Sequence, residues 1–319
     1  MKPRILFMGT PEFAVPALLK LFAGQYPVVG VVCQPDRPQG RHMEPKAPPV
    51  KLSALAHGLP VLQPEKVRTP DFEAAVRSLR PEMIVTAAYG RILPPGILAV
   101  PPLGCLNVHA SLLPAYRGAA PIQWCLIRGE TVTGVTIMKM DEGMDTGDIV
   151  LQRAVAISED IDAGTLGEQL AALGAEMLPE AIEGLLSGRL QPMPQDHALA
   201  TAITPMTRES GAIGWTADAR TIHNLIRGTY PWPGAYTWCQ DRRLKVYKAR
   251  ICTDQEILAA AARMTPGTIC QCGRQAISVA CGSGAVDLLE IQTESGKKMS
   301  CCECAHNYRL GQQLGSKVK

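Results

Sequence analysis

The sequence predicts an α/β protein in which a Rossmann-like domain precedes a small β-barrel domain of the OB type. The chain opens with an apolar run at residues 4–8, then Gly9 and a helix-like pattern over 13–22. This is the order of a first strand, turn and helix in a Rossmann-like sheet. After residue 207, short strand-like runs alternate with glycines, which is typical of a small barrel. A length of 319 residues is enough for two domains, each with its own core.

The other elements of the first domain follow from the spacing of apolar residues. Residues 52–57 and 71–79 have helical patterns, and residues 166–186 form a long helix with a stripe facing the core. Strands are predicted by the apolar runs at 28–33, 83–88, 105–109 and 133–140. The stretch that follows the long helix is rich in proline and contains few large apolar residues, which is typical of a linker. We therefore expect a catalytic domain at 1–189, a linker at 190–206 and a second domain at 207–319.

The second domain carries the basic excess of the chain. Residues 207–319 contain 15 lysines and arginines against 9 acidic residues, whereas the net charge of the whole chain is only +3. After a helix at 216–227, strands are predicted at 244–251, 267–270, 276–280 and 286–291. Arg242 and Arg243 lie among basic residues that interleave with Trp238 and Tyr247. A basic barrel of this kind is a candidate surface for nucleic acid.

The composition excludes membrane and disordered classes. The chain is 46% hydrophobic and 19% charged, which is ordinary for a globular protein. No apolar run is long enough to cross a membrane, and Pro11, Glu12 and Pro16 interrupt the apolar start. We expect a cytoplasmic protein with no membrane partner.

The chain contains 11 cysteines, and most of them lie in the second domain. Only Cys301 and Cys304 have the spacing of a structural zinc site, with His306 nearby. In a cytoplasmic chain, cysteines more often act as small buried hydrophobic residues or metal ligands than as disulfides. We favour buried hydrophobic residues and expect no metal.

The candidate catalytic residues stand where the predicted strand 105–109 ends. Asn107 and His109 alternate with apolar residues, so they lie on one face of that strand. Asp145 lies in a glycine-rich acidic turn after the strand predicted at 133–140. Strand ends of open α/β sheets are where ligands bind. Histidine can move a proton, an asparagine amide can donate to a developing oxyanion, and a carboxylate can hold an imidazole.

Several motifs occur together in an order that resembles the folate-dependent formyltransferases. The stretches that carry the resemblance are Phe7-Met-Gly-Thr-Pro-Glu-Phe-Ala, Gln34-Pro-Asp-Arg-Pro, Asn107-x-His-x-Ser-Leu-Leu-Pro-x-Tyr-Arg-Gly and Asp141-x-Gly-x-Asp-Thr-Gly-Asp. Together with the C-terminal extension, they cover almost the whole chain. The resemblance implies transfer of a formyl group from 10-formyltetrahydrofolate to the α-amino group of methionyl initiator tRNA, for translation initiation. It also implies an enzyme that needs no metal, and we expect a monomer.

The resemblance assigns roles to the site residues. Asn107 would donate a hydrogen bond to the oxyanion, His109 would take the proton of the attacking amine, and Asp145 would orient His109. The segment matching the family's folate-binding stretch consists of Ser111, Leu112, Leu113 and Pro114. By the same resemblance, the backbone after residue 89 lies against the pterin ring, with Ile92 and Leu93 as walls.

The resemblance also places the acceptor end of the tRNA at the long loop of residues 34–50. This loop contains Arg37, Arg41 and Lys46, and Arg41 matches an important arginine of the family. The family usually continues with Gly-Lys-Lys, whereas this chain has His42-Met-Glu. Fewer positive charges predict weaker contact with phosphates. Arg242 and Arg243 are the candidate tRNA contacts on the barrel.

Three other functions remain open from the sequence. A formyltransferase for a small amine would share the catalytic domain without needing the basic barrel or the long loop. An RNA-binding module on an inactive Rossmann scaffold would not need Asn107, His109 and Asp145 together. A metal-dependent redox sensor would use the cysteine cluster.

Overall fold

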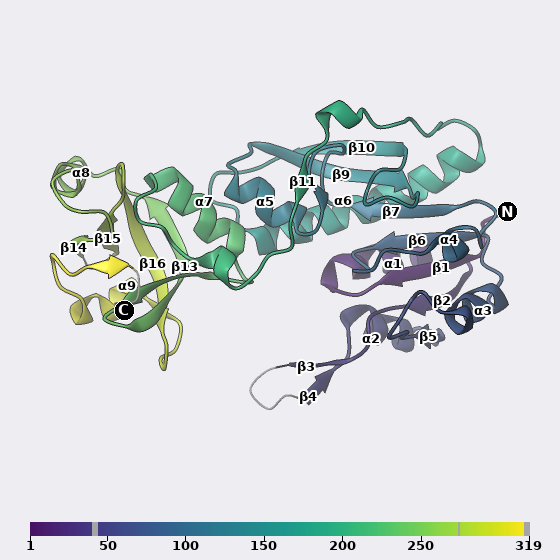
Figure 1. Cartoon of the computed structure of the whole chain (residues 1–319), viewed down its shortest axis with the longest axis horizontal. Helices are drawn as coiled ribbons and strands as arrows, with labels where there is room; N and C mark the ends of the chain where they lie inside the picture. The colour runs from purple at the N-terminus through teal and green to yellow at the C-terminus, as the bar shows by residue number, and fades with distance from the viewer. Residues whose placement is uncertain (40–43, 274, 316–319) are drawn as a thin grey trace. The chain divides into compact units, whose positions relative to one another are not determined.

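The computed structural model describes residues 1–39, 44–273 and 275–315 (Figure 1). The chain divides into two compact units. Unit 1 comprises Met1–Gly118, Val132–Val155 and Gly167–Ile203, and unit 2 comprises Ala119–Thr131, Ala156–Leu166 and the remainder from Thr204. Within the described ranges, no helix is long and apolar enough to cross a membrane.

Unit 1 is built on a seven-stranded sheet with the order β10-β9-β7-β6-β1-β2-β5 (Figure 1). Its strands are β1 (Ile5–Gly9), β2 (Val28–Val32), β5 (Val61–Leu62), β6 (Met83–Ala87), β7 (Cys105–His109), β9 (Val132–Lys139) and β10 (Ile149–Ala156). The five strands from β5 to β7 run parallel, whereas β9 runs antiparallel to β7. The residues of β1 and β6 are all buried, as expected where helices cover both faces of a parallel sheet. The Rossmann-like prediction is confirmed.

Proline occurs in the first turn of several helices of unit 1. The helices of this unit are η1 (Glu12–Ala14), α1 (Val15–Ala23), α2 (Pro49–Ala56), α3 (Pro70–Ser78), α4 (Pro95–Leu98), α6 (Ala163–Leu186) and η2 (His197–Leu199). A proline stands in the first turn of α1, α2, α3 and α4, where its missing N–H would have no partner within the helix. Thr69 caps α3 by accepting a hydrogen bond from the Phe72 N–H. The predicted helices are therefore present, with ends that differ by a few residues.

The order of the parallel strands places a topological switch point beside β1. The chain passes from β1 to β2 and β5 on one side, and then crosses to β6 and β7 on the other. Ligands of open α/β sheets bind at the carboxyl ends of strands near such a point. The carboxyl ends of β6 and β7 lead into the segments that carry the predicted site.

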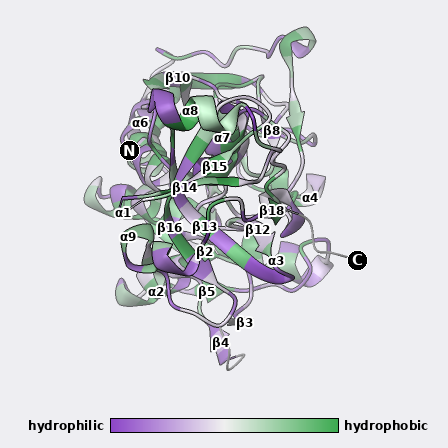
Figure 2. Ribbon diagram, turned by 90° about the vertical axis from the view of Figure 1, so that its left-hand side faces the viewer, coloured by the Kyte–Doolittle hydropathy of each residue, from purple (hydrophilic) through white to green (hydrophobic). Residues whose placement is uncertain are grey.

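The loop predicted at residues 34–50 contains a β-hairpin, β3 (Arg37–Gln39) and β4 (Glu44–Lys46). Figure 2 shows this hairpin in the purple of hydrophilic residues. Asp36 anchors its base through hydrogen bonds from Gln63 and Lys51, and these contacts lower the pKa of the Asp36 carboxyl. Arg41 lies outside the described residues.

The segment predicted as a linker packs on unit 1 as far as Ile203. Strand β11 (Ala202–Ile203) pairs in parallel with β8 (Arg117–Gly118). Met193 pairs with Ile149, the first residue of β10. These contacts pair backbone groups of the segment with strands of unit 1.

Unit 2 contains an antiparallel sheet curled into a half-barrel, with the order β14-β15-β16-β13-β12-β18. Its strands are β12 (Ala235–Cys239), β13 (Arg242–Ile251), β14 (Ile269–Cys272), β15 (Ile277–Ala280), β16 (Ala285–Thr293), β17 (Met299–Ser300) and β18 (Leu314–Gly315). Thr268 forms an antiparallel bridge with Gln313, which joins the two ends of this order. The prediction of a small β-barrel domain is confirmed.

The helices of unit 2 include one from the middle of the chain. They are α5 (Pro121–Ile127), η3 (Glu209–Gly211), α7 (Ala219–Thr229), α8 (Gln255–Ala261), α9 (Cys301–Cys304) and η4 (Ala305–Asn307). In the core of unit 2, Ile222 and Ile226 of α7 cluster with Val246 and Leu288 of the sheet. Helix α5 packs against α7, so this unit is not continuous in sequence.

Most cysteines of unit 2 are buried in its core. Cys301 and Cys304 belong to the main hydrophobic cluster, whereas Cys302 is exposed. Burial raises the pKa of Cys301 to about 12, so its thiol stays protonated and packs as a small apolar group. Among the described residues, no group of three or more His, Cys, Asp or Glu side chains is arranged to hold a metal ion. The burial of Cys301 and Cys304 in the core favours the interpretation of these cysteines as small hydrophobic residues.

Acid should destabilise unit 2 through His223. This residue is 3% exposed, its Nδ1 has no partner in the described part of the chain, and its Nε2 lies 3.8 Å from Asp160 Oδ1. Burial, assisted by the charge of Arg227, lowers the pKa of His223 below the ordinary value of 6.5. The unfolded chain therefore binds the extra proton first, so stability falls as the pH drops below about 6.5.

Urea unfolding monitored from pH 5 to pH 8 measures this effect. We expect the midpoint of the wild type to fall with acid and that of His223→Gln to fall less. The exposed His306 provides the matched substitution, His306→Gln, which should behave like the wild type. Equal acid sensitivity of wild type and His223→Gln would contradict the prediction.

Candidate active site

The structure brings Asn107, His109 and Asp145 together within unit 1. Asn107 and His109 lie on β7, and Asp145 lies on the turn between β9 and β10. His109 Nδ1 is 3.6 Å from Asp145 Oδ1. The predicted convergence of the three residues is therefore present in the fold.

Thr86 sets the orientation of the Asn107 amide. Thr86 lies opposite Asn107 on the parallel neighbour β6, and its hydroxyl donates a hydrogen bond of 2.7 Å to Asn107 Oδ1. The Asn107 Nδ2 group then has no hydrogen-bond partner in the described part of the chain. An amide held by its oxygen, with its N–H groups unpaired, can donate to a negatively charged oxygen of a bound substrate.

The backbone at Tyr116 distinguishes the two ring nitrogens of His109. His109 is 7% exposed, and its Nε2 lies 3.1 Å from the Tyr116 carbonyl oxygen. Because a carbonyl only accepts hydrogen bonds, Nε2 must carry the hydrogen in this contact. Nδ1 is then the nitrogen that can accept a proton. The Asp145 carboxylate is placed to stabilise the positive charge that follows.

Asp145 is held in an uncommon backbone conformation. Its φ of 53° lies in the left-handed region, and its Oδ2 accepts a hydrogen bond of 2.8 Å from the Gly118 N–H. Gly118 itself has a φ of 108°, and a Cβ there would collide with the Ile203 carbonyl. Glycine is therefore required where β8 both pairs with β11 and binds the Asp145 carboxylate.

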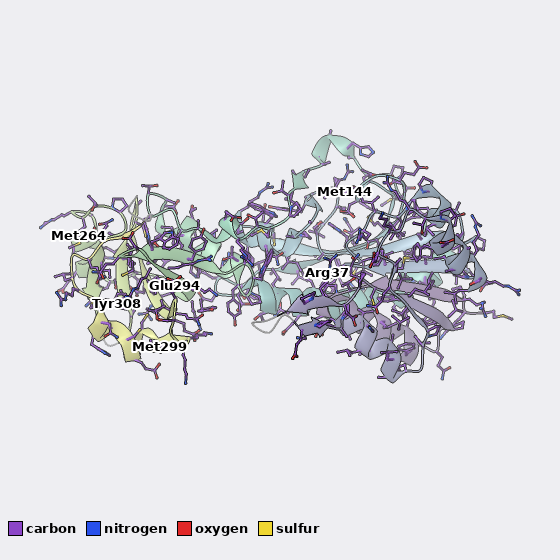
Figure 3. All side chains as sticks on the ribbon, turned by 60° about the horizontal axis from the view of Figure 1, so that its bottom comes forward. Arg37, Met144, Met264, Glu294, Met299 and Tyr308 are labelled. Carbon is purple, nitrogen blue, oxygen red and sulfur yellow. The ribbon has the colours of Figure 1, made fainter. Side chains whose placement is uncertain are left out.

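The rest of the acidic turn is internally bonded. Asp141 Oδ1 accepts hydrogen bonds from the Gly143 N–H at 3.0 Å and the Thr146 hydroxyl at 2.7 Å. A Cβ at Gly147 would collide with the Lys139 carbonyl. Met144 stands exposed on the same turn (Figure 3). The glycines and acidic residues of this motif thus determine the shape of the turn as well as its charge.

The segment of Ser111, Leu112, Leu113 and Pro114 forms a buried turn after β7. The Ser111 hydroxyl donates to the Ala115 carbonyl. Thr136 donates to the Ser111 carbonyl and accepts from the Leu113 N–H. Ser111 and Leu113 are buried, so their side chains shape the turn that carries Tyr116. Their predicted contact with folate remains a prediction.

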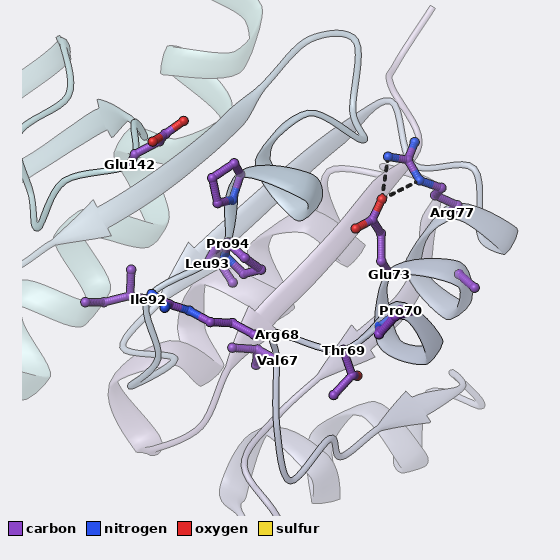
Figure 4. Close-up of a pocket in the computed structure, with 12 residues that line it drawn as sticks. Val67, Arg68, Thr69, Pro70, Glu73, Arg77, Ile92, Leu93, Pro94 and Glu142 are labelled. Atoms are coloured by element: carbon purple, nitrogen blue, oxygen red, sulfur yellow. Dashed lines mark hydrogen bonds and ion pairs between the residues drawn. The ribbon is translucent and has the colours of Figure 1, made fainter.

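A cavity of about 740 Å³ in unit 1 is lined by α3, by the segment before it and by the segment between β6 and α4 (Figure 4). Ile92 and Leu93 form part of its wall, with Ile92 48% exposed and Leu93 buried. Asn107, His109 and Asp145 do not line it, but Glu142 of the acidic turn does. The volume lies within the range of sites for ligands of drug size. The cavity is therefore a candidate binding site for a part of the substrate that lies away from the reacting atoms.

Arg68 provides a positive charge in this cavity. It makes no hydrogen bond or ion pair with any described residue, and in the view of Figure 4 its side chain extends toward Ile92. Arg77, by contrast, is paired with Glu73 at 2.7 Å. Arg68 is thus the lining arginine that remains available for an anionic group.

Three of the described residues that are predicted to contact tRNA are exposed, and a fourth already packs against an aromatic ring. Arg37, labelled in Figure 3, and Lys46 are exposed and lie opposite each other on the hairpin. Arg242 is exposed on β13. The Arg243 guanidinium lies 3.7 Å from the centre of the Tyr236 ring, a stacked cation–π contact. This stacking already occupies one face of Arg243.

Sequence reasoning missed Thr86, the Tyr116 carbonyl and Gln195 as parts of the site. Gln195 donates hydrogen bonds to the carbonyls of Asp145 and Gly147 and accepts them from Arg117. Thr86 was detectable in principle as the one polar residue between apolar neighbours in the predicted strand 83–88. Neither the Tyr116 carbonyl nor Gln195 has a local signal, because each acts through a turn that only the fold creates.

Two family profiles match the chain in order. The first, described as formyl transferase, matches residues 1–182. The second, described as formyl transferase, C-terminal domain, matches residues 205–309. Together they cover the sheet that carries the site and all of the half-barrel except β18.

Curated relatives match along nearly the full length. The chain is 47% identical over 314 residues to the methionyl-tRNA formyltransferase of Acetivibrio thermocellus, covering 98% of this chain and 99% of that protein. It is 49% identical over 312 residues to the one of Caldanaerobacter subterraneus subsp. tengcongensis, covering 98% and 97%.

A solved structure shares the fold at lower identity. The crystal structure of HypX from Aquifex aeolicus in complex with tetrahydrofolic acid superposes with a TM-score of 0.63 and 17% identity. The match covers 95% of this chain and 47% of HypX, so this chain spans about half of that protein.

Proposed function

The chain belongs to the methionyl-tRNA formyltransferase family, and from this premise we propose that it formylates the α-amino group of methionyl initiator tRNA with 10-formyltetrahydrofolate as donor. One observation carries the proposal. The Asn107 amide is held by its oxygen, with Nδ2 unpaired, on the same strand as a histidine that faces a carboxylate. The pairing of an amide donor with a proton acceptor suits attack of an amine on a carbonyl carbon.

The donor fits the residues present. The unpaired Asn107 Nδ2 matches a carbonyl oxygen, and the apolar wall of Ile92 and Leu93 suits an aromatic ring system. Bound 10-formyltetrahydrofolate supplies the formyl carbon that the methionyl amine attacks. His109 accepts the proton of the amine at Nδ1, while the Tyr116 carbonyl holds Nε2–H and Asp145 stabilises the imidazolium. Collapse of the tetrahedral adduct then breaks the bond between the formyl carbon and N10, and N10 takes the proton from His109 as tetrahydrofolate leaves. Asn107 donates to the oxygen on which negative charge develops.

Arg68 should bind the anionic end of the donor. Folates end in a glutamate, and Arg68 lines the cavity beside Ile92 with no partner of its own among the described residues. We expect Arg68→Ala to raise the KM for the donor about tenfold with little change in kcat, the loss of one charge-assisted hydrogen bond. Steady-state kinetics at varied donor concentration measure this KM. The matched control is Lys66→Ala, at a neighbouring exposed lysine. An unchanged KM in Arg68→Ala would contradict this role.

The tRNA would meet basic residues in both parts of the chain. We assign residues 1–189 to catalysis, 190–206 to the connection and 207–319 to binding of the tRNA. Arg37 and Lys46 of the hairpin, and Arg242 and Arg243 of the half-barrel, are the proposed phosphate contacts. Arg41 is proposed on the family resemblance alone.

Transfer of labelled formyl to charged tRNA tests the proposal. Initiator methionyl-tRNA, elongator methionyl-tRNA and free methionine are compared as acceptors with 10-formyltetrahydrofolate as donor. We expect product on the initiator tRNA alone. No product from folded protein that binds tetrahydrofolate would favour a small-amine acceptor instead.

A further inference from the structure

Gln195 occupies a polar position behind the acidic turn of unit 1. It is 5% exposed and comes from the segment between α6 and β11. Its Nε2 donates to the Asp145 carbonyl at 2.9 Å and to the Gly147 carbonyl at 2.6 Å. Its Oε1 accepts from Arg117 Nε at 3.1 Å and Nη2 at 2.6 Å. Both hydrogens of the amide and its oxygen are therefore used.

Arg117 links this amide to the other support of Asp145. The residue after Arg117 is Gly118, whose N–H binds the Asp145 carboxylate. The Arg117 side chain binds Gln195, and Gln195 binds the Asp145 main chain. Asp145 is thus held at its carboxylate by β8 and at its carbonyl by a residue that β8 itself positions. A left-handed backbone at a non-glycine residue requires such support from its surroundings.

We propose that Gln195, held by Arg117, is a positioning residue that fixes Asp145 against His109 for formyl transfer. Gln195 touches neither His109 nor the proposed reacting atoms, and it acts through the backbone of residues 145–147. The inference rests on the proposed function for its kinetic consequence. The restraint of the turn is independent of that function.

Removing the two hydrogen bonds that Gln195 donates should make the acidic turn more mobile. In Gln195→Glu, the oxygen that accepts from Arg117 is kept, but a second carboxylate oxygen replaces the NH2 group that donates to two carbonyls. We expect kcat to fall about 10–100-fold, the effect of a small misplacement of a catalytic group, with the KM for the donor within about twofold of wild type. Gln191→Glu is the matched control, because Gln191 is exposed and, among the described residues, donates only to the Gly188 carbonyl.

A double-mutant cycle with Asp145→Asn separates positioning from general loss of structure. If Gln195 acts through Asp145, then Gln195→Glu should reduce kcat less than about twofold further in an Asp145→Asn background. Equal losses in both backgrounds would overturn the proposal, as would a kcat of Gln195→Glu close to wild type. Arg117→Lys gives a second test, because lysine lacks the two-pronged contact with Oε1, and it should show the same kinetic pattern.

Hydrogen exchange measured by mass spectrometry tests the restraint without any activity. We expect faster exchange in residues 140–148 of Gln195→Glu than in wild type or Gln191→Glu, with other peptides of unit 1 unchanged. Unchanged exchange in this turn, or a uniform increase throughout unit 1, would overturn the proposal. If wild-type protein failed to transfer formyl but the turn still loosened, the proposed function would fall while the positioning by Gln195 would stand.

Discussion

Replacing His109 with alanine should lower kcat for formyl transfer by about 10²–10⁴-fold, the usual contribution of a positioned acid–base group. The reason is the geometry at its two nitrogens. The Tyr116 carbonyl fixes the hydrogen on Nε2, and Nδ1 faces the Asp145 carboxylate. Among the ion pairs of the described residues, His109 is the histidine that faces Asp145. Single-turnover formylation of initiator methionyl-tRNA, with saturating donor, measures the chemical step directly.

The control separates lost chemistry from lost folding. His306→Ala removes an exposed histidine of unit 2 and should leave kcat unchanged. Thermal unfolding and binding of tetrahydrofolate should show that His109→Ala is folded and retains its folate site. If His109→Ala kept a tenth or more of the wild-type rate, His109 would not be the proton acceptor.

Replacing Asn107 with alanine should lower kcat by about 10²–10³-fold, the effect of removing one donor to a developing oxyanion. The KM for the donor should change little, because the hydrogen bond strengthens only as negative charge develops. Thr86→Val tests the same group more gently. It removes the hydroxyl that holds Asn107 Oδ1 but keeps the amide, so its loss should be smaller than that of Asn107→Ala.

The matched substitution for Asn107 is Asn307→Ala, at an exposed position in unit 2, which should leave the rate unchanged. Measuring kcat and KM separately for all three variants provides the comparison. An increase in KM without loss of kcat in Asn107→Ala would show that Asn107 only binds the donor. Equal effects of Thr86→Val and Asn107→Ala would point to a structural role of the pair.

The secondary structure around the site could be predicted because its signals are local. Residues 105–109 alternate apolar and polar side chains, and the structure has β7 at the same residues. Residues 83–88 form an apolar run, and β6 occupies nearly the same range. The hydrophobic effect acts on each of these short segments in the same way whatever its partners. The half-barrel followed from the same kind of signal, namely short strands separated by glycine.

The segment after α6 contains a buried residue that such reasoning does not find. Its prolines and polar residues predict a linker, yet Gln195 is buried and β11 pairs with β8. Burial of a single glutamine leaves no periodic pattern in the sequence. Its partners lie 50 and 78 positions away at Asp145 and Arg117, so no window of neighbouring residues contains them.

The sequence by itself determined the order of the predicted strands along the chain and the two-part organisation, and it singled out Asn107, His109 and Asp145 as the proposed reacting set. Only the tertiary structure decided which atoms of these residues are available. Thr86 pairs with the oxygen of Asn107, and the Tyr116 carbonyl occupies Nε2 of His109. The physical reason is that side-chain type is encoded position by position. Orientation depends on hydrogen-bond partners that come together only when the strands pair and the turns close.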